Sequence, residues 1–201
     1  MKIPLSIGIT GGIGSGKSTV CNVFKILGIP VFEADTVGKK LLDTNAKVKS
    51  EIIHHFGEAV YTPEGAVNRK KLAEIIFNDE IQLEKINGII HPAVKNEYNN
   101  WLKKQRSAYV IHEAAILFES GFYKMMDFTI LVTAPEKDRI KWVTKRDGTS
   151  EKQVRERMVR QWPDEKKQKL ATFVLHNNNQ QLIIPELLKI DKNLRTNGKI
   201  W

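Results

Sequence analysis

The chain carries the nonapeptide Gly11-Gly12-Ile13-Gly14-Ser15-Gly16-Lys17-Ser18-Thr19, and the other predictions are built outward from it. It fits the phosphate-binding loop pattern G-x-x-x-x-G-K-[ST], with Gly11, Gly16, Lys17 and Ser18 at the fixed positions. An apolar run of strand length at 3–9 precedes it, and a helical pattern at 19–27 follows. Because strand, glycine loop and helix is the context that this motif requires, the sequence predicts a nucleotide-phosphate site.

The residue types in this loop suit the binding of a triphosphate. Glycines let backbone N–H groups converge on an anion, and the next helix directs its positive end at the same place. Lys17 supplies a mobile positive charge for the β- and γ-phosphates, and the Ser18 hydroxyl is placed to ligate Mg²⁺. The residues expected to contact the nucleotide are Gly12, Ile13, Gly14, Ser15, Gly16, Lys17, Ser18 and Thr19.

Composition limits the class of protein. The chain has 201 residues, enough for one domain with an inserted subdomain, and 41% of them are hydrophobic. Its net charge of +9 suggests an anionic partner, but the basic residues are spread over helices and do not select nucleic acid. The single cysteine, Cys21, is expected to be a small packing residue in a helix. We find neither a signal-peptide layout nor an apolar run of membrane-spanning length, and we expect a cytoplasmic chain.

Further strands and helices alternate along the chain. Apolar runs of strand length occur at 30–34, 109–111, 128–132 and 173–175. Apolar residues at helical spacing dominate 46–106, and basic helical sequence covers 136–170. We expect a last helix at 180–188 and a loose polar tail at 189–201.

This alternation predicts an α/β fold: a three-layer P-loop NTPase core with a parallel five-stranded sheet. We expect one domain over 1–201, with its core at 1–45, 107–135 and 171–201. The helical insertion at about 46–106 would bind an acceptor, and 136–170 would form a helical lid. Asp35 follows the strand at 30–34, so it is expected at the ligand-binding edge of the sheet.

Three classes of phosphate-loop protein are weighed. Asp35–Gly38 fits a D-x-x-G pattern and Thr144–Asp147 resembles a guanine-reading T-K-x-D, but their spacing argues against a GTPase switch. The acidic strand end that a nucleic-acid motor needs is matched only in part by Val110–Glu113. A small core with a helical acceptor side and an arginine-rich lid favours a kinase, because phosphoryl transfer needs positioning, charge neutralisation and exclusion of water.

The chain resembles the dephospho-coenzyme A kinase (dephospho-CoA kinase) family. The matching residues run in order over about 3–180, and they are Thr10–Thr19, Gly28–Asp35, Asn68–Leu72 before Ile76-Phe77, Ile90-His91-Pro92, Ile116–Glu119, Lys145–Gly148, Arg157 with Gln161, and Ala171–Asn177.

The resemblance implies that ATP, with Mg²⁺, phosphorylates the ribose 3′-hydroxyl of dephospho-CoA to give CoA and ADP. It implies that Asp35 is the base or orienter for the acceptor hydroxyl and that Arg69 and His91 line the acceptor pocket. The partners are ATP and dephospho-CoA, without nucleic acid or membrane, and the chain would be a monomer or a weak homo-oligomer. Another small-molecule nucleotide kinase is the alternative beside the GTPase.

On the nucleotide side, the resemblance implies that Lys17 and Arg146 act on the phosphates, Arg146 from the lid, and that Asn177 lies near the adenine. Simpler roles stay open for several candidates. Asp35 could cap a helix starting at Thr36, His91 could pack beside Pro92 at a helix start, Arg146 could be an exposed helix charge, and Asn177 could be a turn residue.

The chain also departs from the family pattern. Ala115 stands where a proline is usual, and Thr172 and Asn179 replace an aspartate and a glycine. Trp142 occupies the place of an additional lid arginine, for which Arg139 or Lys141 are candidate substitutes.

Overall fold

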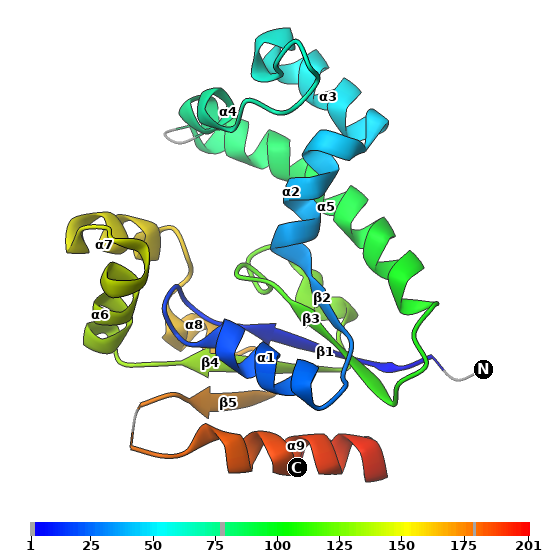
Figure 1. Cartoon of the computed structure of the whole chain (residues 1–201), viewed down its shortest axis with the longest axis vertical. Coiled ribbons are helices and arrows are strands. Elements are labelled where there is room, and N and C mark those ends of the chain that lie inside the picture. The colour runs from blue at the N-terminus through cyan, green and yellow to red at the C-terminus, as the bar shows by residue number, and fades with distance from the viewer. Residues whose placement is uncertain (1–2, 77–78, 179) are drawn as a thin grey trace. The chain divides into compact units, whose positions relative to one another are not determined.

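The structure is a computed structural model, which describes residues 3–76, 79–178 and 180–201. Five parallel strands form one sheet in the order β2-β3-β1-β4-β5 (Figure 1). The strands are β1 (Leu5–Thr10), β2 (Val31–Glu33), β3 (Tyr109–Glu113), β4 (Phe128–Thr133) and β5 (Phe173–His176). The predicted α/β fold with a five-stranded parallel sheet is confirmed.

Helices cover the sheet because its central strands are buried on both faces. Ile7 and Ile9 of β1 are buried in one cluster with Val20 and Phe24 of α1 (Lys17–Ile26) and Leu187 of α9 (Ile183–Asn197). Figure 1 shows α1 and α9 side by side on one face, with α8 (Asp164–Gln168) behind the sheet against β4. The result is the predicted three-layer arrangement.

The chain divides into two compact units, of which the first contains the sheet and the second, the helical unit, is Ala34–Lys103. The helical unit comprises α2 (Ala34–Thr44), α3 (Ala46–Phe56), a 3₁₀ turn (Glu58–Val60), α4 (Arg69–Ile76) and α5 (Glu80–Leu102). It therefore includes residues 34–45, which the sequence assigns to the core. The only strand-like pairing among its described residues is an isolated bridge between Tyr61 and Val67, as expected for a helical insertion.

The helical unit has a core of its own. Val48 and Ile52 of α3, Leu72 of α4 and Ile86 of α5 are buried in one cluster. α5 stays one helix although Pro92 lies inside it, because burial of Val94 and Tyr98 outweighs the backbone hydrogen bond that proline removes. His91 is therefore in the middle of a helix, not at a helix start. Phe77, part of the resemblance, lies outside the described residues.

The lid segment, residues 136–170, is helical as predicted. It comprises α6 (Glu136–Asp147), α7 (Glu151–Val159) and α8. Gly148 ends α6 with a φ of 63°, the left-handed conformation that glycine adopts readily, and Ser150 caps α7 through a capping box with Gln153. Between β3 and β4, a 3₁₀ turn covers Phe122–Met125.

The prediction of a loose tail at 189–201 is wrong, because α9 continues to Asn197. Its inner face buries Ile190 and Leu194, and Ile200 beyond it is buried too. The Tyr109 hydroxyl donates to Asp191 at 2.6 Å, and Arg195 donates both to Asp191 and to the Leu27 carbonyl. Polar composition hid this helix, since only one face of it is apolar.

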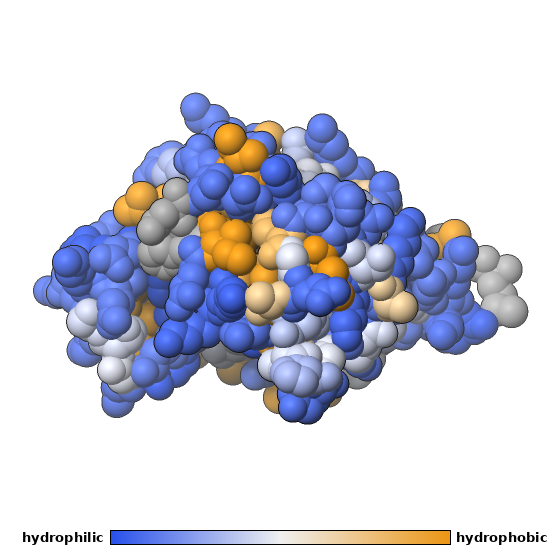
Figure 2. All heavy atoms as spheres, turned by 90° about the horizontal axis from the view of Figure 1, so that it is seen from above, coloured by the Kyte–Doolittle hydropathy of each residue, from blue (hydrophilic) through white to orange (hydrophobic). Residues whose placement is uncertain are grey.

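The surface is consistent with the composition. The face shown in Figure 2 is mostly hydrophilic, with apolar residues gathered in a small area near its middle.

Cys21 is buried in the core, as predicted, and burial raises the pKa of its thiol to about 11. None of the described helices is apolar over a length that could cross a membrane.

Candidate nucleotide site

The phosphate loop, residues 11–18, joins β1 to α1 with the geometry of an anion site. Gly16 is the N-cap of α1, has a φ of 93°, and offers no side chain to cap the helix. A Cβ there would lie 2.3 Å from the Asn177 side-chain nitrogen, which donates to the Ser15 carbonyl at 3.0 Å. The first N–H groups of a helix have no partner within it, so they are available to an anion.

Lys17 is held at the loop by a carboxylate on the neighbouring strand. Its ammonium forms an ion pair with Glu113 at the end of β3, and the two side chains are 13% and 12% exposed. β3 is paired with β1, which puts Glu113 beside the loop. The sequence marked Glu113 only as part of a weak match to an acidic strand end, and the sheet order makes it the partner of Lys17.

A cavity of about 740 Å³ opens over the loop, within the size range of ligand pockets. Besides the loop and Thr19, its walls are Ala115, Trp142, Val143, Arg146, Arg157, Arg160, Gln161 and Asn177. Four of the lining side chains are basic and none of those described is acidic, which suits a polyanion. The nucleotide-side candidates Lys17, Ser18, Arg146 and Asn177 thus meet in one cavity.

The sequence predicts no site role for five of the lining residues: Ala115, Trp142, Val143, Arg160 and Gln161. Arg157, which the sequence gives only as a residue matching the family, lines the cavity together with Arg146. Arg157, Arg160 and Gln161 stand within five positions of one another, at the end of a charged helix where every turn carries a basic residue. Only the fold distinguishes the side chains that face the loop.

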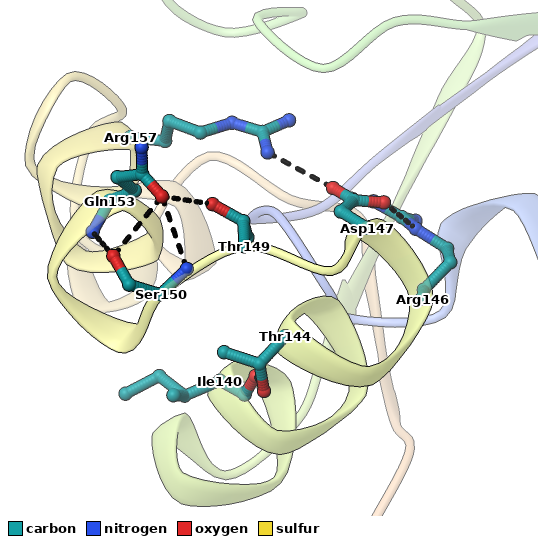
Figure 3. Close-up of polar contacts among 8 residues, drawn as sticks. All are labelled: Ile140, Thr144, Arg146, Asp147, Thr149, Ser150, Gln153 and Arg157. Atoms are coloured by element: carbon teal, nitrogen blue, oxygen red, sulfur yellow. Dashed lines mark hydrogen bonds and ion pairs between the residues drawn. The ribbon is translucent and has the colours of Figure 1, made fainter.

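The two lid arginines share one carboxylate (Figure 3). Arg146 donates to Asp147 at 2.6 and 3.1 Å, and Arg157, ten positions on, donates to the same group at 3.1 Å. These bonds lower the pKa of Asp147 to about 2 and raise the pKa of Arg146. The capped turn between α6 and α7 brings Arg157 back to Asp147, so both arginines are held beside each other at the cavity.

The acceptor-side candidates lie in the helical unit. Asp35 is exposed in the first turn of α2, and Arg69, the first residue of α4, donates to the Asp43 carboxylate at 2.8 Å and to the Lys39 carbonyl at 3.4 Å. His91 is partly buried in α5, and loss of hydration lowers its pKa. Arg69 is thereby fixed along α2, the helix that carries Asp35.

The two short patterns typical of GTPases have structural roles instead. Gly38, the last residue of the D-x-x-G match, is buried in α2 against Ile90 and Val94 of α5. Asp147, the last residue of the T-K-x-D match, binds the two lid arginines at the end of a helix. Gly38 and Asp147 both lie in helices, and the GTPase interpretation loses its support.

Comparison with known proteins decides the family. A sequence profile of dephospho-CoA kinases matches residues 5–182. The chain belongs to the dephospho-CoA kinase family. It is 43% identical over 178 residues to the dephospho-CoA kinase of Salinibacter ruber, covering 86% of this chain and 88% of that protein.

Solved structures related to the dephospho-CoA kinase family share the fold. The dephospho-CoA kinase from Campylobacter jejuni superposes with a TM-score of 0.70 at 27% identity, over 96% of this chain and 98% of that one. A Thermus thermophilus protein of known crystal structure has a TM-score of 0.83 at 34% identity, over 96% and 97% of the two chains.

The departures from the dephospho-CoA kinase pattern can now be placed. Trp142 lines the cavity, but neither proposed substitute for the missing arginine does. Arg139 is 9% exposed, and its guanidinium donates to the Ile13 carbonyl and to Asp164. Lys141 is exposed on α6, away from the cavity walls. The additional positive charges of the cavity are Arg157 and Arg160. Asn179 lies outside the described residues.

Proposed function

We propose that this chain transfers the γ-phosphoryl group of ATP to the ribose 3′-hydroxyl of dephospho-CoA, giving CoA and ADP in the last step of CoA synthesis. The observation that carries the proposal is the basic cavity over the phosphate loop, in a chain of the dephospho-CoA kinase family. A cavity that converges backbone N–H groups, a lysine and arginines on one point is suited to the charge of a transferring phosphoryl group.

On the nucleotide side, the N–H groups at the start of α1 bind the β-phosphate and Lys17 exchanges Glu113 for the β- and γ-oxygens. Arg146 and Arg157 neutralise the charge that develops on the transferring group. Support comes from their shared position at the cavity and from the long reach of arginine side chains. Asn177, beside Ser15 and Gly16, is assigned to the adenine end of the nucleotide.

Mg²⁺ fits the donors that this cavity offers. The Ser18 hydroxyl lines it, whereas no group of three or more His, Cys, Asp or Glu side chains that could cage a metal occurs among the described residues. Mg²⁺ retains water and binds through substrate phosphates and one or two protein oxygens, so Ser18 with the ATP oxygens satisfies it. When bound, the ion would neutralise charge between the β- and γ-phosphates.

On the acceptor side, the Asp35 carboxylate receives the proton of the 3′-hydroxyl as its oxygen attacks the γ-phosphorus. The bond from that phosphorus to ADP breaks, and ADP keeps the bridging oxygen. Arg69 pairs with acceptor phosphate, and His91, whose pKa is lowered by burial, makes a hydrogen bond to the acceptor. We place the enzyme in the cytoplasm as a monomer or weak homo-oligomer, without nucleic-acid or membrane partners.

An acceptor assay tests the proposal. ATP and GTP are each incubated with the chain and Mg²⁺, with and without dephospho-CoA, and CoA and nucleoside diphosphate are quantified. We expect CoA and ADP in equal amounts, formed only with the acceptor and preferentially from ATP. Guanine preference with slow hydrolysis in the absence of acceptor would support the GTPase. Phosphorylation of another acceptor but not of dephospho-CoA would refute the proposed acceptor and support the alternative of another small-molecule nucleotide kinase.

Replacing Lys17 tests the nucleotide side of the same proposal. Lys17→Ala should lower turnover by about 10²-fold or more, because it removes a charge that acts on the transferring group. Lys25→Ala is the matched control, since Lys25 lies on the same helix but pairs with Glu33 at the surface. Turnover of Lys17→Ala close to that of Lys25→Ala would remove Lys17 from the chemistry.

A further inference from the structure

Two side chains of the lid segment bind the backbone of Ile13, a residue in the middle of the phosphate loop. The Ile13 N–H donates to the Gln161 side-chain oxygen at 2.8 Å. The Ile13 carbonyl accepts from Arg139 Nε at 2.9 Å. These partners lie 148 and 126 positions further along the chain, so the contacts exist only in the folded protein.

Arg139 is itself fixed in place. It is 9% exposed, and its second nitrogen donates to Asp164 at 3.1 Å. Its guanidinium lies so close to Gly12 that a Cβ at that position would be 2.1 Å from Arg139 Nη2. Gly12 is not a fixed position of the phosphate-loop pattern, and this contact gives the physical reason for a glycine there.

Gln161 holds the backbone N–H of Ile13, on the opposite side of the residue from Arg139. Its amide oxygen accepts from Ile13 while its amide nitrogen donates to the Ala115 carbonyl at 3.3 Å, in the segment that follows β3. Only a side chain with an acceptor and a donor at one end can make both bonds, which glutamate and leucine cannot. The Ile13 N–H is therefore directed at the lid segment, and the phosphate site is left to the N–H groups nearer α1.

We propose that Arg139 and Gln161 are positioning residues that hold the phosphate loop in its anion-binding conformation before ATP arrives. This inference deepens the proposed function and rests on it. A glycine-rich loop has many conformations, and ordering its residues costs free energy, so a loop that is already ordered binds its ligand more tightly. The rival role for Arg139 is a salt bridge that only joins α6 to α8.

A pair of variants separates these roles. Arg139→Met removes the guanidinium and leaves Asp164 without its partner, so stability and ATP affinity should both fall. Arg139→Met with Asp164→Asn removes the uncompensated charge. We expect this double variant to regain thermal stability but to bind ATP about tenfold more weakly than wild type by calorimetry, the loss of about one hydrogen bond. Arg155→Met is the control, because Arg155 pairs with Glu151 and Glu136 at the surface.

Gly12→Ala provides a second measure, since the new methyl group must displace the guanidinium. It should weaken ATP binding about tenfold in wild type and change it little in the Arg139→Met background, because the contact is already lost there. Additive effects would overturn the inference, as would wild-type affinity in the double variant. Turnover at saturating ATP should stay within a fewfold of wild type in Arg139→Met with Asp164→Asn and in Arg155→Met, because Arg139 acts on loop order and not on the transferring group.

Hydrogen exchange without ligand keeps this inference separable from the function. Loop amides, Ile13 above all, should exchange faster in Arg139→Met with Asp164→Asn and in Gln161→Leu, but not in Arg155→Met. Faster exchange combined with no CoA formation by wild type would refute the proposed kinase and leave the positioning role standing. CoA formation by wild type with unchanged exchange and affinity in the variants would refute the positioning role alone.

Discussion

His112 makes the stability of this protein depend on pH in a way that can be calculated. It lies in β3, 1% exposed, between the rings of Phe32 and Phe122, whose centroids are 5.4 and 5.3 Å from its own. Burial lowers its pKa from 6.5 to about 4, because an imidazolium there would lose its hydration. Between these two pH values the unfolded chain binds a proton that the folded chain does not.

The sign and size of the effect follow by linkage. A lowered histidine pKa leaves the free energy of unfolding unchanged above about pH 7. As the pH falls below 6.5 this free energy decreases, and the contribution of the histidine to the decrease is complete below about pH 4. A shift from 6.5 to about 4 corresponds to about 3 kcal/mol at most and about 2 kcal/mol at pH 5. Urea unfolding at about pH 7.5 and pH 5 measures this difference.

The variant His112→Phe isolates the contribution of this one ring. A phenyl group can stack between the same neighbours and cannot bind a proton. Between pH 7.5 and pH 5, the free energy of unfolding of the variant should therefore fall by about 2 kcal/mol less than that of wild type. His55→Gln is the control, because His55 is exposed and should leave the wild-type dependence unchanged. If His112→Phe loses as much stability on acidification as wild type does, burial of His112 is not the cause.

Three other perturbations give independent checks. Asp35→Asn should lower turnover about 10²-fold or more while ATP affinity holds, because the role we propose for Asp35 is proton acceptance; weaker ATP binding with normal saturating turnover would contradict it. Leu194→Ala should cost about 2–5 kcal/mol in urea unfolding, whereas Ile184→Ala, 53% exposed, should stay within about 0.5 kcal/mol; equal losses would show that α9 does not pack as described. Asp147→Asn should raise the KM for ATP about twofold to fivefold, because the exposed carboxylate that orients the two lid arginines is lost, and Asp147→Glu should recover part of it; an unchanged KM would mean that the arginines need no such orientation.

Local patterns were enough to predict the sheet and the phosphate loop. β1, the glycine loop and α1 occupy one continuous stretch, and their periodicity and glycine positions identify them without any distant partner. The same holds for the capped turn between α6 and α7, where Ser150 and Gln153 are three positions apart. Such elements carry their own signals because the interacting groups are close in sequence.

Elements whose stability depends on distant contacts were predicted less well. The C-terminal half of α9, residues 191–197, is mostly polar and is held by Tyr109 and by the Leu27 carbonyl, neither of which is visible in its own sequence. The α5 helix passes through Pro92, which by local rules is a boundary. In both cases burial against residues far away in the chain outweighed the local preference.

The lid segment shows most clearly where a sequence pattern stops being informative about a site. Arg139 and Arg146 stand on one helix and have the same side chain, yet Arg139 is buried beneath the loop and Arg146 lines the cavity. The difference is set by what each faces: Gly12 leaves room for one guanidinium, and Asp147 holds the other. Because a guanidinium is always charged, its role follows from geometry and not from protonation. An arginine in this segment can therefore be assigned to the phosphates or to the loop only once its partner is known.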